Sequence, residues 1–383
     1  MIHILLVLIY LTFISLGLPD AVLGAAWPVM HQELNVSVSY AGILTFFTCG
    51  FTIVASLLSA RLTKKFGTGL VVIFSVFLTA VGLLGYYFSS QFYMLVLFAI
   101  PYGLGAGGID AALNNYVAIH FKAKHMSWLH AMWGLGATLG PYAMSFALTN
   151  NMPWNDGYLI IFIIQSLLLF VLFLSLPLWK NTKNEEVCKI KVLGFKELFS
   201  IKGLIFLLVM FFCYCALEQT AMLWASSYLI SNNNVSVDTA AFFASMFCIG
   251  ITVGRIISGF VSIKLKDKNM IRLGLVFILI GIILLFINMN IVLTYIAFII
   301  IGFGCAPIYP SIIHATPDYF GKDISQSLIG IQMAVAYIGV LFVPPLFGII
   351  ADFITVTLLP LFLLIFLILM IVCHEILLYK REK

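Results

Sequence analysis

The chain consists of long apolar stretches separated by short polar gaps. A helix needs roughly 20 apolar residues to cross the hydrocarbon core of a bilayer. The pattern therefore predicts an all-α integral membrane protein, because twelve stretches reach that length. We place these predicted transmembrane helices at residues 4–30, 38–62, 68–88, 92–121, 126–149, 156–179, 201–230, 237–263, 269–287, 291–317, 324–353 and 356–379.

The longest hydrophilic stretch, residues 181–200, divides the twelve segments six and six. It carries both signs of charge and a short amphipathic segment, which is typical of a cytoplasmic tether with a surface helix. The sequence therefore predicts an N-terminal six-helix bundle over residues 1–180, a linker over 181–200, and a C-terminal six-helix bundle over 201–383.

Short motifs recur in the two predicted bundles at nearly constant spacing. The matched positions are Asp20 and Glu218, Gly50 and Gly250, Gly103 and Gly302, and Gly136 and Gly339, with offsets of 198 to 203 residues. Parallel six-helix halves that are related by an axis along the membrane normal form a transporter architecture, in which the solute binds between the halves near mid-depth. The repeat therefore predicts two pseudo-symmetric bundles.

Composition supports a membrane protein. Hydrophobic residues make up 63% of the 383 residues and charged residues 9%, whereas a soluble chain has about 25% charged residues. Mean hydropathy is +1.13. We expect the net charge of +5 to meet anionic lipid headgroups, and we do not expect nucleic acid as a partner. The seven cysteines lack metal-ligand spacing, so no metal and no cofactor is predicted.

Basic residues occur in every second polar gap. Apart from Arg255, each Lys and Arg lies in one set of alternate gaps or in the C-terminal tail. Basic loops stay on the cytoplasmic side of a membrane. The N-terminal residues lack a basic region before the apolar stretch, so we expect a first transmembrane helix and not a cleaved signal. These features predict a multi-pass protein of the inner or plasma membrane with both termini in the cytoplasm.

Four ionisable side chains lie deep inside predicted transmembrane helices: Asp20, Asp110, Glu218 and Arg255. Each costs about 2.5–3.5 kcal/mol on insertion scales, so such groups usually face a wet cavity and act there. Pro19 precedes Asp20 and is expected to kink the first helix. We interpret the three acids as candidate proton-coupling groups, although each could be a neutral acid that serves packing. Arg255 could pair with one of them or extend toward the cytoplasm.

A neutral solute can be held by polar groups set among aromatic rings. Asn114 lies one turn after Asp110 on the same helical face, and Gln219 adjoins Glu218. Together with Asp20, Asp110 and Glu218, the candidate solute-binding residues are therefore Trp27, Asn114, His130, Trp133, Gln219, Trp224, Tyr309 and Gln332. Aromatic rings also belong to ordinary packing and to interface belts, and that alternative stays open for each ring.

These residues resemble those of the major facilitator superfamily and, within it, the fucose permease-like branch of sugar–cation symporters. The resemblance covers most of the chain and rests on Gly105-Ala106-Gly107-Gly108-Ile109-Asp110 with Asn114, Glu218 with Trp224, Gly254-Arg255, Ala306-Pro307-Ile308-Tyr309-Pro310, and Gly330-Ile331-Gln332 with Gly339 and Pro344. It implies that Asp20 and Asp110 match the two carboxylates that handle proton and sugar. It also implies a monomer. The fucose carrier has Glu where this chain has Asp110, so the identity of the sugar stays open.

One segment departs from the superfamily pattern. Between the second and third predicted helices the superfamily usually carries an Asp before a basic residue and a glycine. Here Lys64 stands at that position, ahead of Lys65 and Gly67. The sequence therefore does not predict the usual charge latch to the neighbouring helix.

The function predicted from these features is secondary active uptake of a sugar or similar polyhydroxylated solute by alternating access. Its partners would be the solute, H⁺ or Na⁺ as coupling ion, and the lipid bilayer. A proton-coupled exporter of drugs or metabolites is the alternative, although the glycine pair of the antiporter motif after Gly140-Pro141 is replaced by Met144-Ser145. A membrane enzyme or sensor is the third possibility, but no HExxH, GxSxG or P-loop motif is present, so we predict no enzymatic activity.

Overall fold

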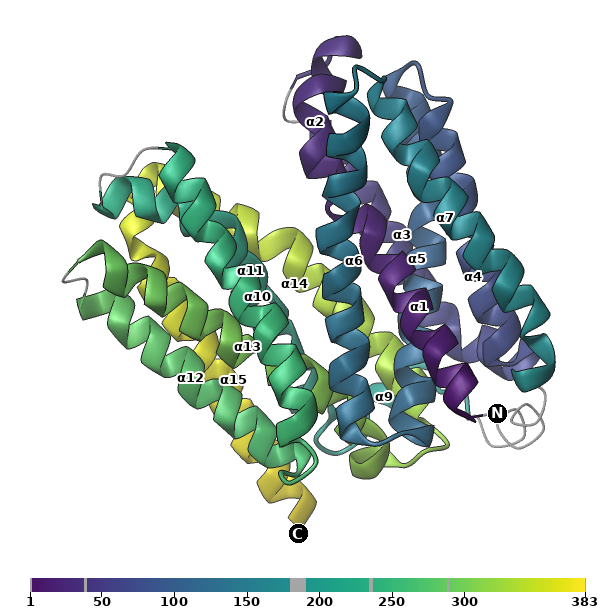
Figure 1. The fold of residues 1–383 in the computed structure, drawn as a ribbon. Helices are drawn as coiled ribbons and strands as arrows, with labels where there is room; N and C mark the ends of the chain where they lie inside the picture. The colour runs from purple at the N-terminus through teal and green to yellow at the C-terminus, as the bar shows by residue number, and fades with distance from the viewer. Residues whose placement is uncertain (1, 38–39, 180–190, 234–236, 288–289, 383) are drawn as a thin grey trace. The chain divides into compact units, whose positions relative to one another are not determined.

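The computed structural model describes residues 2–37, 40–179, 191–233, 237–287 and 290–382. These described residues form helices and connecting turns and contain no strand (Figure 1). The helices are α1 (Ile2–Asp20), α2 (Val22–Glu33), α3 (Tyr40–Phe66), α4 (Thr68–Tyr87), α5 (Phe92–His120), α6 (Ala123–Thr149), α7 (Trp154–Leu174), α9 (Phe195–Phe199), α10 (Leu204–Asn233), α11 (Val237–Val261), α12 (Asp267–Ile287), α13 (Ile291–Phe320), α14 (Ser325–Phe353), the 3₁₀ turn η1 (Val356–Leu358) and α15 (Leu359–Glu382).

The predicted set of membrane-crossing helices is confirmed. Within the described part of the chain, ten segments are helical, long and apolar enough to cross a membrane, and a shorter apolar segment lies in α11. α6 fills the remaining predicted position with 27 residues. It is less apolar than the others because it carries His125, His130 and three glycines. The short helix α9 lies in the predicted linker, of which residues 181–190 fall outside the described residues.

The first predicted crossing consists of two helices and not one. α1 ends at Asp20 and α2 begins at Val22, with Ala21 between them at φ −98° and ψ −3°. Proline lacks a backbone N–H and its ring crowds the preceding turn, so Pro19 weakens the helix at this point. The kink predicted from Pro19 is therefore a helix break that places Asp20 at the end of a helix within the crossing.

The chain packs as two compact units. The first comprises Met1–Tyr116, Leu129–Val192 and Lys322–Ala334, and the second comprises Val117–Trp128, Leu193–Gly321 and Val335–Lys383. α14 thus contributes its first turns to the first unit and the rest to the second. The division predicted from the sequence, into bundles over residues 1–180 and 201–383, stays a prediction.

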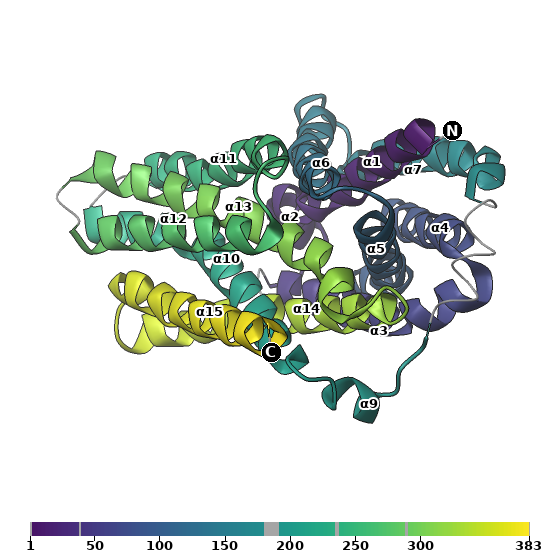
Figure 2. The same ribbon diagram turned by 90° about the horizontal axis from the view of Figure 1, so that it is seen from below.

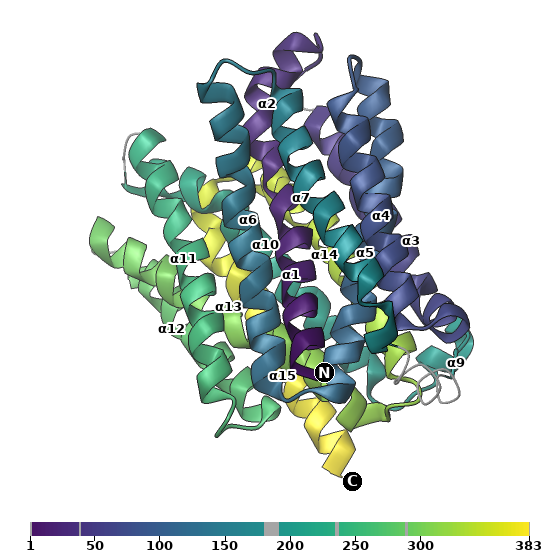
Figure 3. The ribbon, with the colours of Figure 1, turned by 45° about the vertical axis from the view of Figure 1, so that its right-hand side comes forward.

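In the first unit α1 runs between α6 and α7, as two views show (Figures 1 and 3). The hydrophobic core draws on α1 to α7. Its large side chains include Trp27 of α2, Tyr86 of α4, and Trp154 and Tyr158 of α7, which are all buried. Large apolar side chains such as that of Phe74 remain on the outside, as expected for helices that face lipid.

The second unit is built around α13, which packs against α10, α11 and α12, while α15 packs against α10 and α12. Figure 2 shows α12 beside α13 and α15 beside α10. Arg272 of α12 donates two hydrogen bonds to the carboxylate of Glu375 on α15, at 2.8 and 2.6 Å. This bidentate pair links the two helices at the surface.

Glycine contacts repeat between the two halves of the sequence. A glycine has no Cβ, so it lets a neighbouring backbone come closer than any other residue allows. The matching contacts, in which both partners are offset by 199 residues, are Gly82 to Phe98 and Gly281 to Ala297, Gly103 to Thr48 and Gly302 to Phe247, and Gly105 to Ser75 and Gly304 to Gly274. The repeat read from the sequence therefore extends to the contacts that hold neighbouring helices together.

A second set of glycines brings α1 against α6. A Cβ at Gly17 would overlap the carbonyl oxygen of Trp133, and a Cβ at Gly136 or Gly140 would overlap carbonyl oxygens of α1, including that of Leu18. The two backbones are therefore in direct contact. This contact sets the C-terminal end of α1, which carries Asp20, beside the middle of α6.

Replacing Gly140 by Ala tests the importance of this contact. The new Cβ would collide with the carbonyl oxygen of Leu18, and overpacking of a close contact costs about 1–3 kcal/mol. We expect Gly140→Ala to lower the thermal unfolding midpoint of the detergent-solubilised protein. Gly50→Ala on α3 is the matched control, because open space surrounds Gly50. Equal unfolding midpoints for the two variants would contradict a close α1–α6 contact.

Candidate functional site

The carboxylate of Asp20 is held by two aromatic side chains of the first unit. The hydroxyl of Tyr102 on α5 donates to Oδ1 at 3.0 Å, and the indole N–H of Trp133 on α6 donates to Oδ2 at 2.7 Å. The side chain of Asp20 is nevertheless exposed. Each carboxylate oxygen therefore has one neutral donor and keeps room to accept a further hydrogen bond.

A second carboxylate lies on α5, where Asp110 is buried together with Asn114 and His130. The amide nitrogen of Asn114 donates to Oδ1 of Asp110 at 2.7 Å and to its backbone oxygen at 2.9 Å. Nε2 of His130 on α6 lies 3.0 Å from Oδ1 of Asn114, and the ring of Phe13 on α1 meets the imidazole edge-on at 5.5 Å. The three polar side chains form one hydrogen-bonded chain between α5 and α6.

The residues that hold Asp20 and the residues joined to Asp110 lie near each other along α5 and α6. Tyr102 and Asp110 are eight residues apart on α5, which is about 12 Å of helix, and His130 and Trp133 are one turn apart on α6, about 4.5 Å. The structure therefore brings four residues predicted from the sequence, Asp20, Asp110, His130 and Trp133, into one region of α1, α5 and α6.

The third acid lies in the second unit and forms an ion pair. Nη2 of Arg255 on α11 lies 3.3 Å from Oε1 of Glu218 on α10, and both side chains are buried. The sequence left two alternatives for Arg255, pairing with an acid or extending toward the cytoplasm. The structure shows Arg255 paired with Glu218. The pair differs chemically from Asp20, whose hydrogen-bond donors are uncharged.

Two predicted rings of the second unit pack against other rings. The indole N–H of Trp224 donates to the carbonyl oxygen of Pro344 at 3.0 Å, and the ring meets Phe347 at 5.6 Å. Tyr309 lies 4.8 Å from Phe211, measured between ring centroids. Gln219 is half-buried.

The two remaining candidates lie within the first unit. Trp27 belongs to its hydrophobic core, with the ring of Phe92 at 6.4 Å. Gln332 is fully buried in the early part of α14. At the start of that helix Ser325 donates to Oδ1 of Asn115 at 2.6 Å, so hydrogen bonds between neutral side chains hold the helix to α5. Lys64, by contrast, is exposed.

Sequence reasoning did not identify Tyr102 as a hydrogen-bond partner of Asp20, nor Ser325 as a partner of Asn115. Tyr102 lies two turns before Asp110 on a glycine-rich helix, so the helical period could have identified it as a partner on the same face. Nothing local indicates which aromatic residue reaches Asp20, because the hydrogen bond joins residues 82 positions apart.

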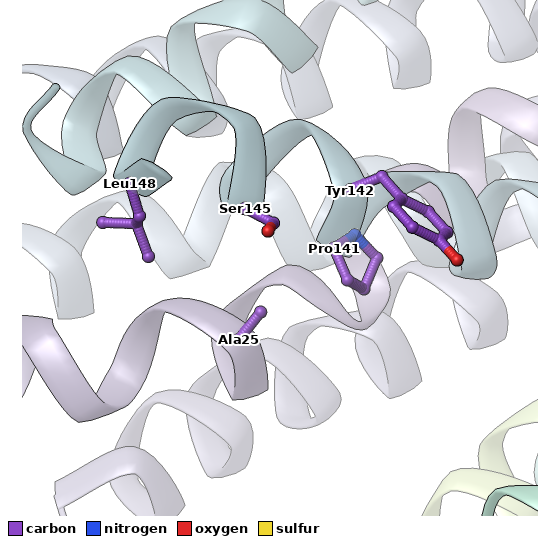
Figure 4. Close-up of a pocket in the computed structure, with 5 residues that line it drawn as sticks. All are labelled: Ala25, Pro141, Tyr142, Ser145 and Leu148. Carbon is purple, nitrogen blue, oxygen red and sulfur yellow. The ribbon is translucent and has the colours of Figure 1, made fainter. Parts of the chain in front are cut away.

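A small open cavity of about 370 Å³ lies between α2 and α6. Figure 4 shows its lining, Ala25 of α2 and Pro141, Tyr142, Ser145 and Leu148 of α6. Apart from the Ser145 and Tyr142 hydroxyls it is apolar. Ala25, the lining residue from α2, comes five residues after Asp20 in the sequence. The lining residues include no acid.

These observations define a class: an all-helical transporter with acids on membrane-crossing helices. A family profile described as Major Facilitator Superfamily matches residues 9–231 and 207–383. The chain therefore belongs to the major facilitator superfamily. It is a multi-pass membrane transporter and not an enzyme, as the sequence predicted.

Known relatives agree with this assignment. The glucose/mannose transporter GlcP of Bacillus subtilis is 24% identical over 318 residues, which cover 79% of this chain and 77% of the relative. Bypass of stop codon protein 6 of Saccharomyces cerevisiae is 23% identical over 397 residues, which cover 91% of this chain and 77% of the relative.

Solved structures share the fold. The E. coli fucose:proton symporter FucP superposes with a TM-score of 0.80 at 15% identity, over 98% of both chains. The proton:xylose symporter XylE superposes with a TM-score of 0.77 at 15% identity, over 97% of this chain and 94% of the other. These superpositions confirm the predicted major facilitator fold.

The buried ion pair can be tested by a double-mutant cycle. Removing one partner of a buried pair leaves the other charge uncompensated, which costs about 3–5 kcal/mol. We expect Glu218→Gln to lower the thermal unfolding midpoint of the purified protein, and the double variant Glu218→Gln with Arg255→Met to recover much of the loss. Purely additive effects of the two substitutions would show that the pair does not interact.

Proposed function

We propose that this transporter takes up a sugar or a similar polyhydroxylated solute together with protons, by alternating access. The observation that carries the proposal is the environment of Asp20. Its carboxylate lies at a helix break inside a membrane crossing, is exposed, and is held by the neutral donors Tyr102 and Trp133.

Neutral donors leave a carboxylate able to gain and lose a proton. A carboxylate that is paired with a guanidinium is strongly held in its charged form. Ion pairs of the described residues include Arg255 with Glu218, Arg272 with Glu375 and His314 with Asp267. Asp20, by contrast, is held by Tyr102 and Trp133. A solute that binds one protonation state better than the other then couples proton binding to the conformational equilibrium.

The chemistry around Asp20 suits a sugar. A carboxylate accepts hydrogen bonds from hydroxyl groups, and the adjoining indole of Trp133 offers an apolar face to the carbon-bound hydrogens of a sugar ring. The names of three similar proteins point the same way: a glucose/mannose transporter, a fucose:proton symporter and a proton:xylose symporter.

The proposal includes an orientation. Basic gaps lie in the cytoplasm by the positive-inside rule, so both termini are cytoplasmic. The other candidate solute contacts stay predictions from the sequence: Asp110, Asn114, Glu218, Gln219, Trp224 and Tyr309. We propose that the protein acts as a monomer.

Asp20→Asn tests the coupling role. Asparagine keeps the size and an acceptor oxygen but cannot titrate, so gradient-driven sugar uptake in proteoliposomes should fall to the background while sugar exchange persists. Asp156→Asn is the matched control, because Asp156 lies in the first turn of α7 and is expected to leave both activities unchanged. Full gradient-driven uptake by Asp20→Asn would overturn the coupling role.

A thermal-shift screen tests the class of solute. Purified protein is heated with a panel of hexoses, pentoses and polyols at two pH values, with and without sodium. A ligand at 100 times its dissociation constant stabilises a protein by about 2.7 kcal/mol, so a bound sugar should raise the unfolding midpoint, and the shift should depend on pH and not on sodium. Stabilisation by lipophilic cations alone would favour the exporter.

A further inference from the structure

The chain of hydrogen bonds from Asp110 through Asn114 to His130 has a fixed direction. A backbone carbonyl can only accept a hydrogen bond, and one end of the Asn114 amide lies 2.9 Å from the backbone oxygen of Asp110. That end is therefore the NH₂ group. The same group lies 2.7 Å from the Asp110 carboxylate.

The orientation of the amide determines the hydrogen on His130. With its NH₂ group turned to Asp110, Asn114 presents its carbonyl oxygen to Nε2 of His130 at 3.0 Å. An amide oxygen only accepts, so Nε2 must carry a hydrogen. In this arrangement Oδ1 of Asp110 carries no proton, since it accepts from the amide.

We propose that His130 is a positioning residue for proton coupling, which acts on Asp110 through Asn114 so that the three side chains gain and lose protons as one unit. The inference rests on the proposed function, in which Asp110 is one of the coupling acids. All three side chains are buried, so water does not readily replace their hydrogen-bond partners. Each donor in the chain must therefore face an acceptor on its neighbour.

The linked change balances for a single proton. The backbone oxygen of Asp110 holds the NH₂ group of Asn114 in place, so an incoming proton is taken by Oδ2 of Asp110 while Oδ1 continues to accept from the amide. A neutral carboxyl polarises the amide less than a carboxylate does, so the carbonyl oxygen of Asn114 becomes a weaker acceptor for the Nε2–H of His130. The unit gains one proton in total, on Asp110, and His130 keeps its Nε2 proton.

Other titratable groups lie on the helices that contact the imidazole of His130 or its partner Asn114. On α1, which contributes Phe13 to the imidazole, Tyr10 lies one turn earlier and Asp20 two turns later. On α5, Tyr102 lies two turns before Asp110. Tyr102 and Trp133 both donate to Asp20. The hydrogen bonds through Asn114 join His130 to Asp110, so Asp110 is the acid that this chain links to His130.

Nuclear magnetic resonance of the full-length protein with isotope-labelled histidine tests the linkage without any solute. The chain has seven histidines, and loss of one signal in His130→Gln assigns His130. We expect the Nε2–H tautomer in the ionised state of Asp110. We also expect Asp110→Asn to move the pH midpoint of the His130 signal by about one unit or more, as for coupled sites. Asp156→Asn is the control that should leave the midpoint unchanged.

Asn114→Leu separates linkage through the amide from a direct effect of charge. In this background Asp110→Asn should no longer move the midpoint of His130. An Nδ1–H tautomer at all pH values, an unmoved midpoint in Asp110→Asn, or an equal shift in the Asn114→Leu background would each overturn the proposal.

Transport supplies the second readout. Glutamine can place an N–H donor where Nε2 stands but cannot titrate. His130→Gln should therefore lose at least about tenfold in gradient-driven uptake, equivalent to about 1.4 kcal/mol, and should lose more of that uptake than of sugar exchange. Wild-type uptake and pH profile in His130→Gln would reduce His130 to a packing role. If the wild-type protein moves no sugar, the proposed function fails, whereas the resonance measurements still decide whether the three side chains are linked.

Discussion

The structure depends on satisfying carboxylates inside an apolar membrane. An ionised side chain without partners is prohibitively costly there, so it must be hydrogen-bonded or paired. Asp20 is held by a phenol and an indole, Asp110 by an amide, and Glu218 by the guanidinium of Arg255. These three solutions differ in one respect that matters for function, because only a carboxylate with neutral donors stays free to change its protonation state at modest cost.

Close helix packing makes those hydrogen bonds possible. Gly17, Gly136 and Gly140 remove the side chains that would separate α1 from α6, so Trp133 can reach Asp20 at the end of α1. The same means, a glycine against a carbonyl oxygen, recurs in both halves at a spacing of 199 residues. Small residues on membrane helices therefore serve both the general packing and the placement of the Asp20 site.

The sequence predicted the fold well because hydropathy and helix length directly reflect the bilayer. It also predicted Asp20, Asp110, Asn114 and His130 as functional candidates, since polar residues are conspicuous in apolar helices. It could not predict that Tyr102 and Trp133 share Asp20, because such contacts depend on how three helices cross. It also offered Trp27 as a candidate solute-binding residue, and the structure places this ring in the hydrophobic core, beyond the break between α1 and α2.

The most direct test of proton-coupled sugar uptake is to record proton and sugar movement together. Weakly buffered proteoliposomes with the same pH on both sides receive a radiolabelled sugar that the protein binds, while a pH electrode follows the medium. The account predicts that the medium becomes more alkaline in step with sugar entry. Sugar entry with no change in the pH of the medium would contradict it.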